Sequence, residues 1–109
     1  MLSEEQVLAA LRDCFDPEIK LNIVDLGLIY KVKIEPDPDA STPKWPRQRV
    51  KVTMTLTTPN CPASGLIFEQ VQNRLAGISN ISKVDVNLVW EPPWTSERIS
   101  EAGRLQLGI

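Results

Sequence analysis

Two stretches of the chain alternate strictly between apolar and polar residues. In residues 28–35 the apolar positions are Leu28, Tyr30, Val32 and Ile34. In residues 49–57 they are Val50, Val52, Met54 and Leu56. A period of two is typical of strands that bury one face and expose the other, so we predict an antiparallel pair. Residues 82–90 indicate a third strand, with expected buried positions at Val84, Val86, Leu88 and Trp90.

Three other segments have helical spacing. Ser3 is expected to cap the first helix, because Gln6 three residues later completes a capping box. The apolar face of this helix is predicted to contain Val7, Leu8, Leu11, Cys14 and Phe15. Residues 63–75 predict a second helix, whose inward side holds Ser64, Ile67, Phe68, Val71 and Leu75. A short final helix, capped by Thr95 or Ser100, should run through Ile99, Ala102 and Leu105.

The predicted order α-β-β-α-β-α defines the fold class as α+β. We expect one small domain over residues 1–109, with a three-stranded mixed sheet and helices packed on it. Residues 36–48 hold four of the nine prolines and form a long proline-rich insertion in the hairpin between the first two strands. Trp45 is the one large apolar residue of this insertion, and we expect it to pin the loop down.

Composition excludes several functions. The net charge of −2 gives no reason to expect nucleic acid or an anionic membrane as a partner. The chain has no histidine, which excludes Ser-His-Asp and Cys-His catalysis and every zinc site that uses histidine. The first residues, MLSEEQ, are acidic where a signal peptide needs positive charge, so a cytoplasmic location is expected.

One of the two cysteines stands in a distinctive context, TTPNCP. Pro62 suits the first position of a helix, which makes Cys61 the expected N-cap of the second helix. Unpaired backbone N–H groups and the helix dipole would stabilise a thiolate there, and Thr57 and Thr58 could donate further hydrogen bonds. Spacing alone allows an alternative in which Cys61 merely replaces serine as a buried cap. Cys14, by contrast, is expected to be a core residue.

Three separated motifs, DPEIKLNIVDLGLIY, TMTLTTPNCP and VNLVWEPPWTSERISEAGRLQLG, together resemble the SufT/PaaD-like family of iron–sulfur assembly proteins. The resemblance covers nearly the whole chain except the insertion at residues 36–48. It implies a role in the maturation of iron–sulfur proteins, with Cys61 as the motif cysteine. The chain stops at Ile109 without the cysteine-rich segment of PaaD-like members, and it has no phosphate loop, so we expect the stand-alone SufT-like branch.

The resemblance also implies further site residues. Its acidic D-P-E motif falls on Asp16, Pro17 and Glu18, and its D-L-G motif falls on Asp25, Leu26 and Gly27. Asp25 and Glu18 are candidates for oxygen ligands or for tuning the thiolate, although such carboxylates also cap turns, which is the interpretation we favour for Asp16. The W-x-P-P-W motif places a partner-docking surface on Trp90, Pro92, Pro93 and Trp94.

Three functions follow from these observations. The first is a non-enzymatic assembly, carrier or targeting factor that holds a transient iron–sulfur cluster or iron, with none tightly bound after aerobic purification. Since clusters usually take four thiolates, a homodimer or partner proteins would supply the other ligands. Its partners would be iron–sulfur assembly proteins and apo clients. The alternatives are an adaptor that binds no cluster and a thiol-dependent redox enzyme.

Overall fold

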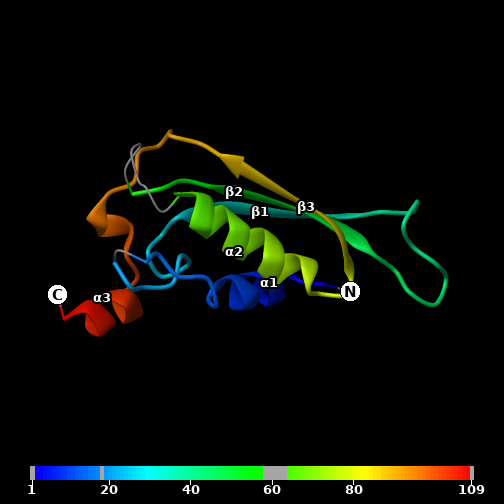
Figure 1. The fold of residues 1–109 in the computed structure, drawn as a ribbon, viewed down its shortest axis with the longest axis horizontal. Helices are drawn as coiled ribbons and strands as arrows, with labels where there is room; N and C mark the ends of the chain where they lie inside the picture. Colours follow the sequence, from blue (N-terminus) through cyan, green and yellow to red (C-terminus); the bar gives the residue numbers. More distant parts are fainter. Residues whose placement is uncertain (1, 18, 58–63, 109) are drawn as a thin grey trace.

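A three-stranded mixed sheet organises the fold (Figure 1). The computed structural model describes residues 2–17, 19–57 and 64–108. Strand β1 (Ile29–Pro36) pairs antiparallel with the central strand β2 (Gln48–Met54), which pairs parallel with β3 (Ile81–Leu88). The helices are α1 (Glu4–Leu11), α2 (Ser64–Ala76), the 3₁₀ helix η1 (Ser96–Arg98) and α3 (Glu101–Leu107). The predicted fold class and element order are therefore confirmed.

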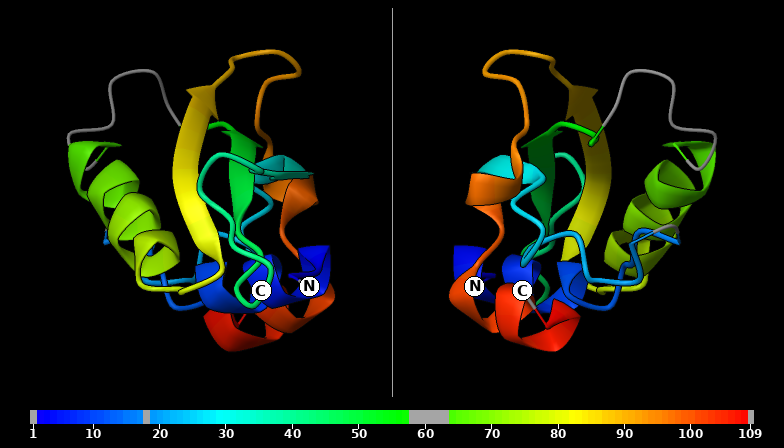
Figure 2. Two further views of the ribbon diagram at one scale, coloured as in Figure 1. Left: turned by 90° about the vertical axis from the view of Figure 1, so that its right-hand side faces the viewer. Right: turned by 90° about the vertical axis from the view of Figure 1, so that its left-hand side faces the viewer.

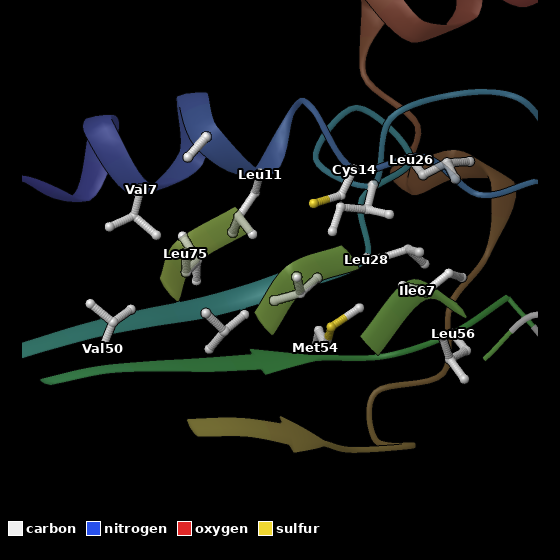
Figure 3. Close-up of a cluster of buried hydrophobic side chains, with 14 of the residues drawn as sticks. Val7, Leu11, Cys14, Leu26, Leu28, Val50, Met54, Leu56, Ile67 and Leu75 are labelled. Carbon is white, nitrogen blue, oxygen red and sulfur yellow. The ribbon is translucent and has the colours of Figure 1, made fainter. Parts of the chain in front are cut away.

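The core lies between the sheet and helices α1 and α2 (Figure 3). The central strand contributes the buried side chains of Val50, Val52 and Met54, and Leu56 continues the same face beyond the strand. These are the positions that the alternation predicts. Helix α1 adds Val7, Ala10 and Leu11, and α2 adds Ile67, Val71 and Leu75. Within the described part of the chain, no helix is long and apolar enough to cross a membrane.

The N-terminal helix begins as predicted but ends earlier. The Ser3 hydroxyl accepts from the Gln6 N–H, and the Gln6 side chain accepts from the Ser3 N–H, so the capping box is complete. Because α1 ends at Leu11, the helical period no longer places the residues that follow. Cys14 is buried as expected, but the prediction for Phe15 is wrong, since its side chain is 48% exposed.

Two other expected core residues lie at the surface. Strand β3 ends at Leu88, two residues before Trp90, and the Trp90 side chain is 41% exposed. In α3 the Ser100 cap is confirmed, because its hydroxyl accepts from the Gly103 N–H. Leu105 is nevertheless 78% exposed, because α3 turns the buried Gly103 rather than Leu105 toward the protein.

The connection between β1 and β2 forms its own small structure. Thr42 and Trp45 exchange two backbone hydrogen bonds of 3.0 Å, and the Ser41 hydroxyl bonds backbone groups of Asp37 and Arg47. The guanidinium of Arg47 lies 5.3 Å from the centre of the Trp45 ring, which remains 50% exposed. Trp45 therefore makes contacts within the loop and does not insert into the core.

Gly103 provides a test of how tightly α3 packs. A Cβ at this position would lie 2.9 Å from Leu21 Cδ2 and 3.0 Å from Ile99 Cγ2. We expect Gly103→Ala to lower the free energy of unfolding by about 1–3 kcal/mol through overpacking. Gly65 in α2 is the matched control, because a Cβ there meets nothing within 4 Å. Gly65→Ala should leave stability unchanged or raise it by up to about 1 kcal/mol in urea denaturation. Equal effects of the two changes would contradict the packing argument.

Candidate functional site

The three sequence motifs converge at one end of the sheet. Strand β1 begins at this end, and β2 and β3 finish there, because β1 alone runs in the opposite direction. Figures 1 and 2 show the segment that follows β3 passing around this end toward α3. The Thr55 N–H donates to the Leu28 carbonyl, and the Val89 N–H donates to the Met54 carbonyl. The loop before β1, the exit of β2 and the exit of β3 are thus joined directly.

The indole of Trp94 fastens the loop that holds the D-L-G motif. Its Nε1–H donates to the Leu26 carbonyl at 2.6 Å, and the ring packs against the core. Next to it, Gly27 has a φ of +81°, and a Cβ there would collide with the backbone carbonyl of Arg98. Both the dihedral and the close approach require glycine. The W-x-P-P-W and D-L-G motifs are therefore parts of one packed unit.

Both carboxylate oxygens of Asp25 have hydrogen-bond partners. Oδ2 accepts from Asn22 Nδ2 at 2.7 Å, and Oδ1 accepts from the Ser100 hydroxyl at 2.9 Å. The Asp25 carbonyl also accepts from the Ser100 N–H at 2.8 Å. Asp25 thus joins its loop to the cap of α3. Its role as a ligand or a tuning group for the thiolate stays a prediction.

The remaining docking candidates line the same end of the molecule. Pro92 and Pro93 are exposed, and the Pro92 carbonyl accepts from the Tyr30 hydroxyl at 2.7 Å. The Arg98 guanidinium lies 4.8 Å from the centre of the Tyr30 ring. A shallow hollow beside these contacts is lined by Gly27, Ile29, Tyr30, Pro92 and Arg98. Tyr30 was expected in the core and instead forms one wall of this hollow.

The acidic motif packs against α2. The Asp16 side chain is buried and Oδ1 accepts from the Ile19 N–H at 3.2 Å, which confirms the turn-capping interpretation for Asp16. The side-chain amide of Gln70 accepts from the Phe15 N–H and donates to the Phe15 carbonyl, each at 3.0 Å. This pair of bonds holds the residue before the motif against the helix. Glu18 lies outside the described residues.

Cys61, Pro62 and Thr58 also lie outside the described residues, so the predicted helix cap stays a prediction. Thr57 is half-buried just before that stretch. Thr55 is fully buried, although strand alternation would place it on the wet face, and its hydroxyl has no partner among the described residues. The exit of β2 is therefore enclosed. No group of three or more Cys, Asp or Glu in the described part of the chain could hold a metal ion.

Sequence reasoning missed four residues of this site: Asn22, Tyr30, Arg98 and Ser100. The pattern identified Ser100 as a helix cap, and it is one. Its hydroxyl also donates to the carboxylate of Asp25, 75 positions away in sequence. No local sequence pattern predicts a hydrogen bond over that separation. The backbone of Arg98 packs against Gly27, and its guanidinium lies over the Tyr30 ring. Both contacts join residues that are far apart in the sequence.

Comparison with known proteins identifies the family. A family model described as iron-sulfur cluster assembly protein matches residues 4–88, and the chain belongs to this family. It is 40% identical to a Fe-S protein maturation auxiliary factor of Porphyromonas gingivalis, over 98% of this chain and 92% of that protein. It is also 40% identical to the Fe-S protein maturation auxiliary factor SufT of Staphylococcus aureus, over 86% of this chain and 96% of that protein.

A solved structure supports the same assignment. The domain of unknown function DUF59 from Bacillus anthracis superposes with a TM-score of 0.80 at 34% identity, covering 97% of this chain and 92% of that chain. The resemblance expected from the three motifs is therefore confirmed, and so is the α+β fold.

The two cysteines should differ sharply in reactivity. Cys14 is 1% exposed, and burial, reinforced by the charge of Asp13 and opposed by Arg74, raises the pKa of its thiol. Because the thiolate is the nucleophile, Cys14 should resist alkylation until the protein unfolds. We expect Cys61 to react with iodoacetamide far faster, as measured by mass spectrometry of peptides from the native protein. Equal rates, or a Cys61 pKa at or above the ~8.5 of an unperturbed cysteine, would remove the helix-cap argument.

Proposed function

We propose that this chain is a maturation factor that receives an iron–sulfur cluster and passes it to apo client proteins through Cys61. The observation that carries the proposal is the packing at the exit of β2, the strand that leads toward Cys61. There the loop of Asp25 and Leu26 is held by Trp94 and Ser100 through hydrogen bonds of 2.6–2.9 Å. A fixed frame of this kind suits a site that must present a thiolate in a defined direction.

The cluster is cargo in this proposal, and the chain supplies only part of its ligand set. Iron–sulfur clusters usually take four thiolates. Cys14 is buried in the core and cannot contribute without unfolding. The remaining thiolates must come from a second molecule, either another copy of this chain or an assembly partner. Shared ligation also makes transfer easy, because a client can replace the partner's ligands one at a time.

The same features disfavour a thiol-dependent redox enzyme. Such an enzyme needs a second thiol that resolves the oxidised cysteine, and Cys14 is enclosed by core side chains such as Leu11 and Leu28. We therefore take the chain to be non-enzymatic. It would act in the cytoplasm, where both cysteines remain thiols.

An adaptor that binds clients without holding a cluster is the second candidate. The exposed Trp90 favours it, because tryptophan is enriched at the centre of protein interfaces and this one is 41% exposed. Pro93 is exposed three residues further on. In both candidates this surface contacts a protein, and the two differ in whether the thiol is required.

Replacement of the thiol separates the two candidates. Cys61→Ser should leave the protein folded, with stability changed by no more than ~1 kcal/mol, because serine is a good helix cap. The hydroxyl stays protonated at neutral pH and is a poor ligand for iron that prefers thiolate. We expect iron–sulfur enzyme activities to fall in a strain that depends on this protein. Circular dichroism and thermal melting would confirm folding, and Cys14→Ser is the matched control.

The outcome decides between a carrier that binds the cluster through Cys61 and an adaptor that binds clients without a cluster. Full client activity with a folded Cys61→Ser variant would overturn the carrier proposal and favour the adaptor. In that case Trp90→Ala should lower client activity. Anaerobic reconstitution with iron and sulfide, followed by absorption spectroscopy, gives an independent reading of cluster binding by the unmodified chain.

A pair of variants tests whether the Asp25 carboxylate has a role beyond packing. Ser100→Ala removes the hydroxyl that donates to Oδ1 but keeps the carboxylate. Asp25→Asn keeps the shape but removes the charge. Each change should cost about 1–3 kcal/mol of stability, because a partly buried hydrogen bond is lost or weakened and Ser100→Ala also removes the cap of α3. If the carboxylate tunes the site, Asp25→Asn alone should lower client activity at equal stability. Parallel losses in both variants would assign Asp25 a structural role only.

A further inference from the structure

The second face of the sheet carries a dense set of charged side chains. Helices α1 and α2 lie against the apolar face (Figure 1), and the residues that alternate with the core positions point the other way. The strand register arranges them in three rows across β1, β2 and β3. The rows are Lys31–Thr53–Asn87, Lys33–Lys51–Asp85 and Glu35–Arg49–Lys83. We call these nine residues the basic sheet face, and each of them is exposed or half-exposed.

The charge of this face is opposite to that of the whole chain. It contains five cations, Lys31, Lys33, Arg49, Lys51 and Lys83, and two carboxylates, Glu35 and Asp85. The face therefore has a net charge of +3, within a chain whose net charge is −2. The rest of the molecule is correspondingly acidic. Such a separation of charge steers a partner of opposite sign toward one side of a protein.

The cations of the basic sheet face are only partly neutralised by the two carboxylates in the same rows. Lys33 is paired with Glu35 at 2.8 Å, but Arg49, Lys51 and Lys83 make no ion pair within the described residues. Arg49 lies directly opposite Glu35, and Lys51 lies directly opposite Asp85, but each cation also has a like charge on its other side, because Lys33 lies opposite Lys51 and Lys83 lies opposite Arg49. Like charges in directly opposed positions destabilise a sheet. An anionic ligand placed over these rows would relieve that repulsion.

The face is also hollowed where the cations gather. A shallow depression there is lined by Lys33, Glu35, Arg49, Lys51, Lys83 and Asp85. Its lining has no aromatic side chain on which a nucleic-acid base could stack. Its two carboxylates would repel a continuous phosphate backbone, whereas a protein segment can place its own charges to match them. A protein ligand fits this pattern better than a nucleic acid.

We propose that the basic sheet face docks an acidic segment of a protein partner, with carboxylates seated over Arg49, Lys51 and Lys83. The proposal rests on the charge pattern alone and does not require that Cys61 carry a cluster. It adds a second contact surface, formed by the middle of the sheet rather than by the end where the motifs converge.

The test uses the full chain and a fluorescein-labelled peptide of alternating Glu and Gly, followed by fluorescence anisotropy. A peptide of alternating Lys and Gly and a single-stranded oligonucleotide are measured in parallel. We expect the acidic peptide to bind at low ionic strength and to weaken as salt is added, since salt screens exposed charges. The double variant Lys51→Glu, Lys83→Glu should weaken binding about tenfold or more, because attraction becomes repulsion.

The control is a double variant with the same change in net charge elsewhere. Arg12 and Lys44 are exposed and lie outside the three rows, so Arg12→Glu, Lys44→Glu should retain most of the affinity. Lys51→Gln, Lys83→Gln provides a milder change if the reversed charges disturb folding, which thermal melting would reveal. Absence of peptide binding, equal losses in both reversal variants, or tighter binding of the oligonucleotide would each overturn the proposal. Cysteine replacement should leave peptide binding unchanged, which separates this test from that of the carrier function.

Discussion

The burial of an irregular segment is the constraint on which the rest of the structure depends. The described residues between α1 and β1 form no helix or strand, yet Leu21, Ile23, Leu26 and Leu28 are 1% exposed or less. A buried backbone group without a partner costs about 1–3 kcal/mol. The segment's carbonyls must therefore find donors in the surrounding protein. Leu28 finds one in the backbone of Thr55, Leu26 in the indole of Trp94, and Asp25 in the backbone of Ser100.

Two of those three donors come from the last sixteen residues of the chain, so the C-terminal segment completes a site whose other parts come much earlier. Gly27 and Gly103 allow the C-terminal segment to pack this closely, because Arg98 lies against Gly27 and Leu21 lies against Gly103. A substitution in α3, such as one at Gly103, can therefore alter the Asp25 loop without changing Asp25 itself. The two motifs that carry the family resemblance at either end of the chain are physically a single unit.

The sequence predicts the regular elements well, because each is defined by local rules. The alternation correctly predicted the buried side of β2. The capping residues Ser3 and Ser100 both accept the predicted hydrogen bonds from backbone N–H groups. Two failures lie where an element ends and its period stops, namely Phe15 after α1 and Trp90 after β3. Two others, Tyr30 in β1 and Leu105 in α3, lie inside an element that presents another residue to the core. The site was predicted only as a set of motifs. That Trp94 bonds Leu26, and Ser100 bonds Asp25, follows from long-range packing that no spacing in the chain reveals.

The central strand connects the properties of this molecule. The even-numbered residues of β2, from Val50 to Met54, build the core, while Arg49 and Lys51 project to the opposite face. The same strand then leads, through the enclosed Thr55, into the stretch that contains Cys61. Because β2 is hydrogen-bonded on both sides, it is the least free of the three strands to shift. A partner bound across the charged rows would therefore be held in a fixed position relative to the exit of β2. In the functions proposed above, one rigid strand would couple recognition on the sheet to chemistry at Cys61.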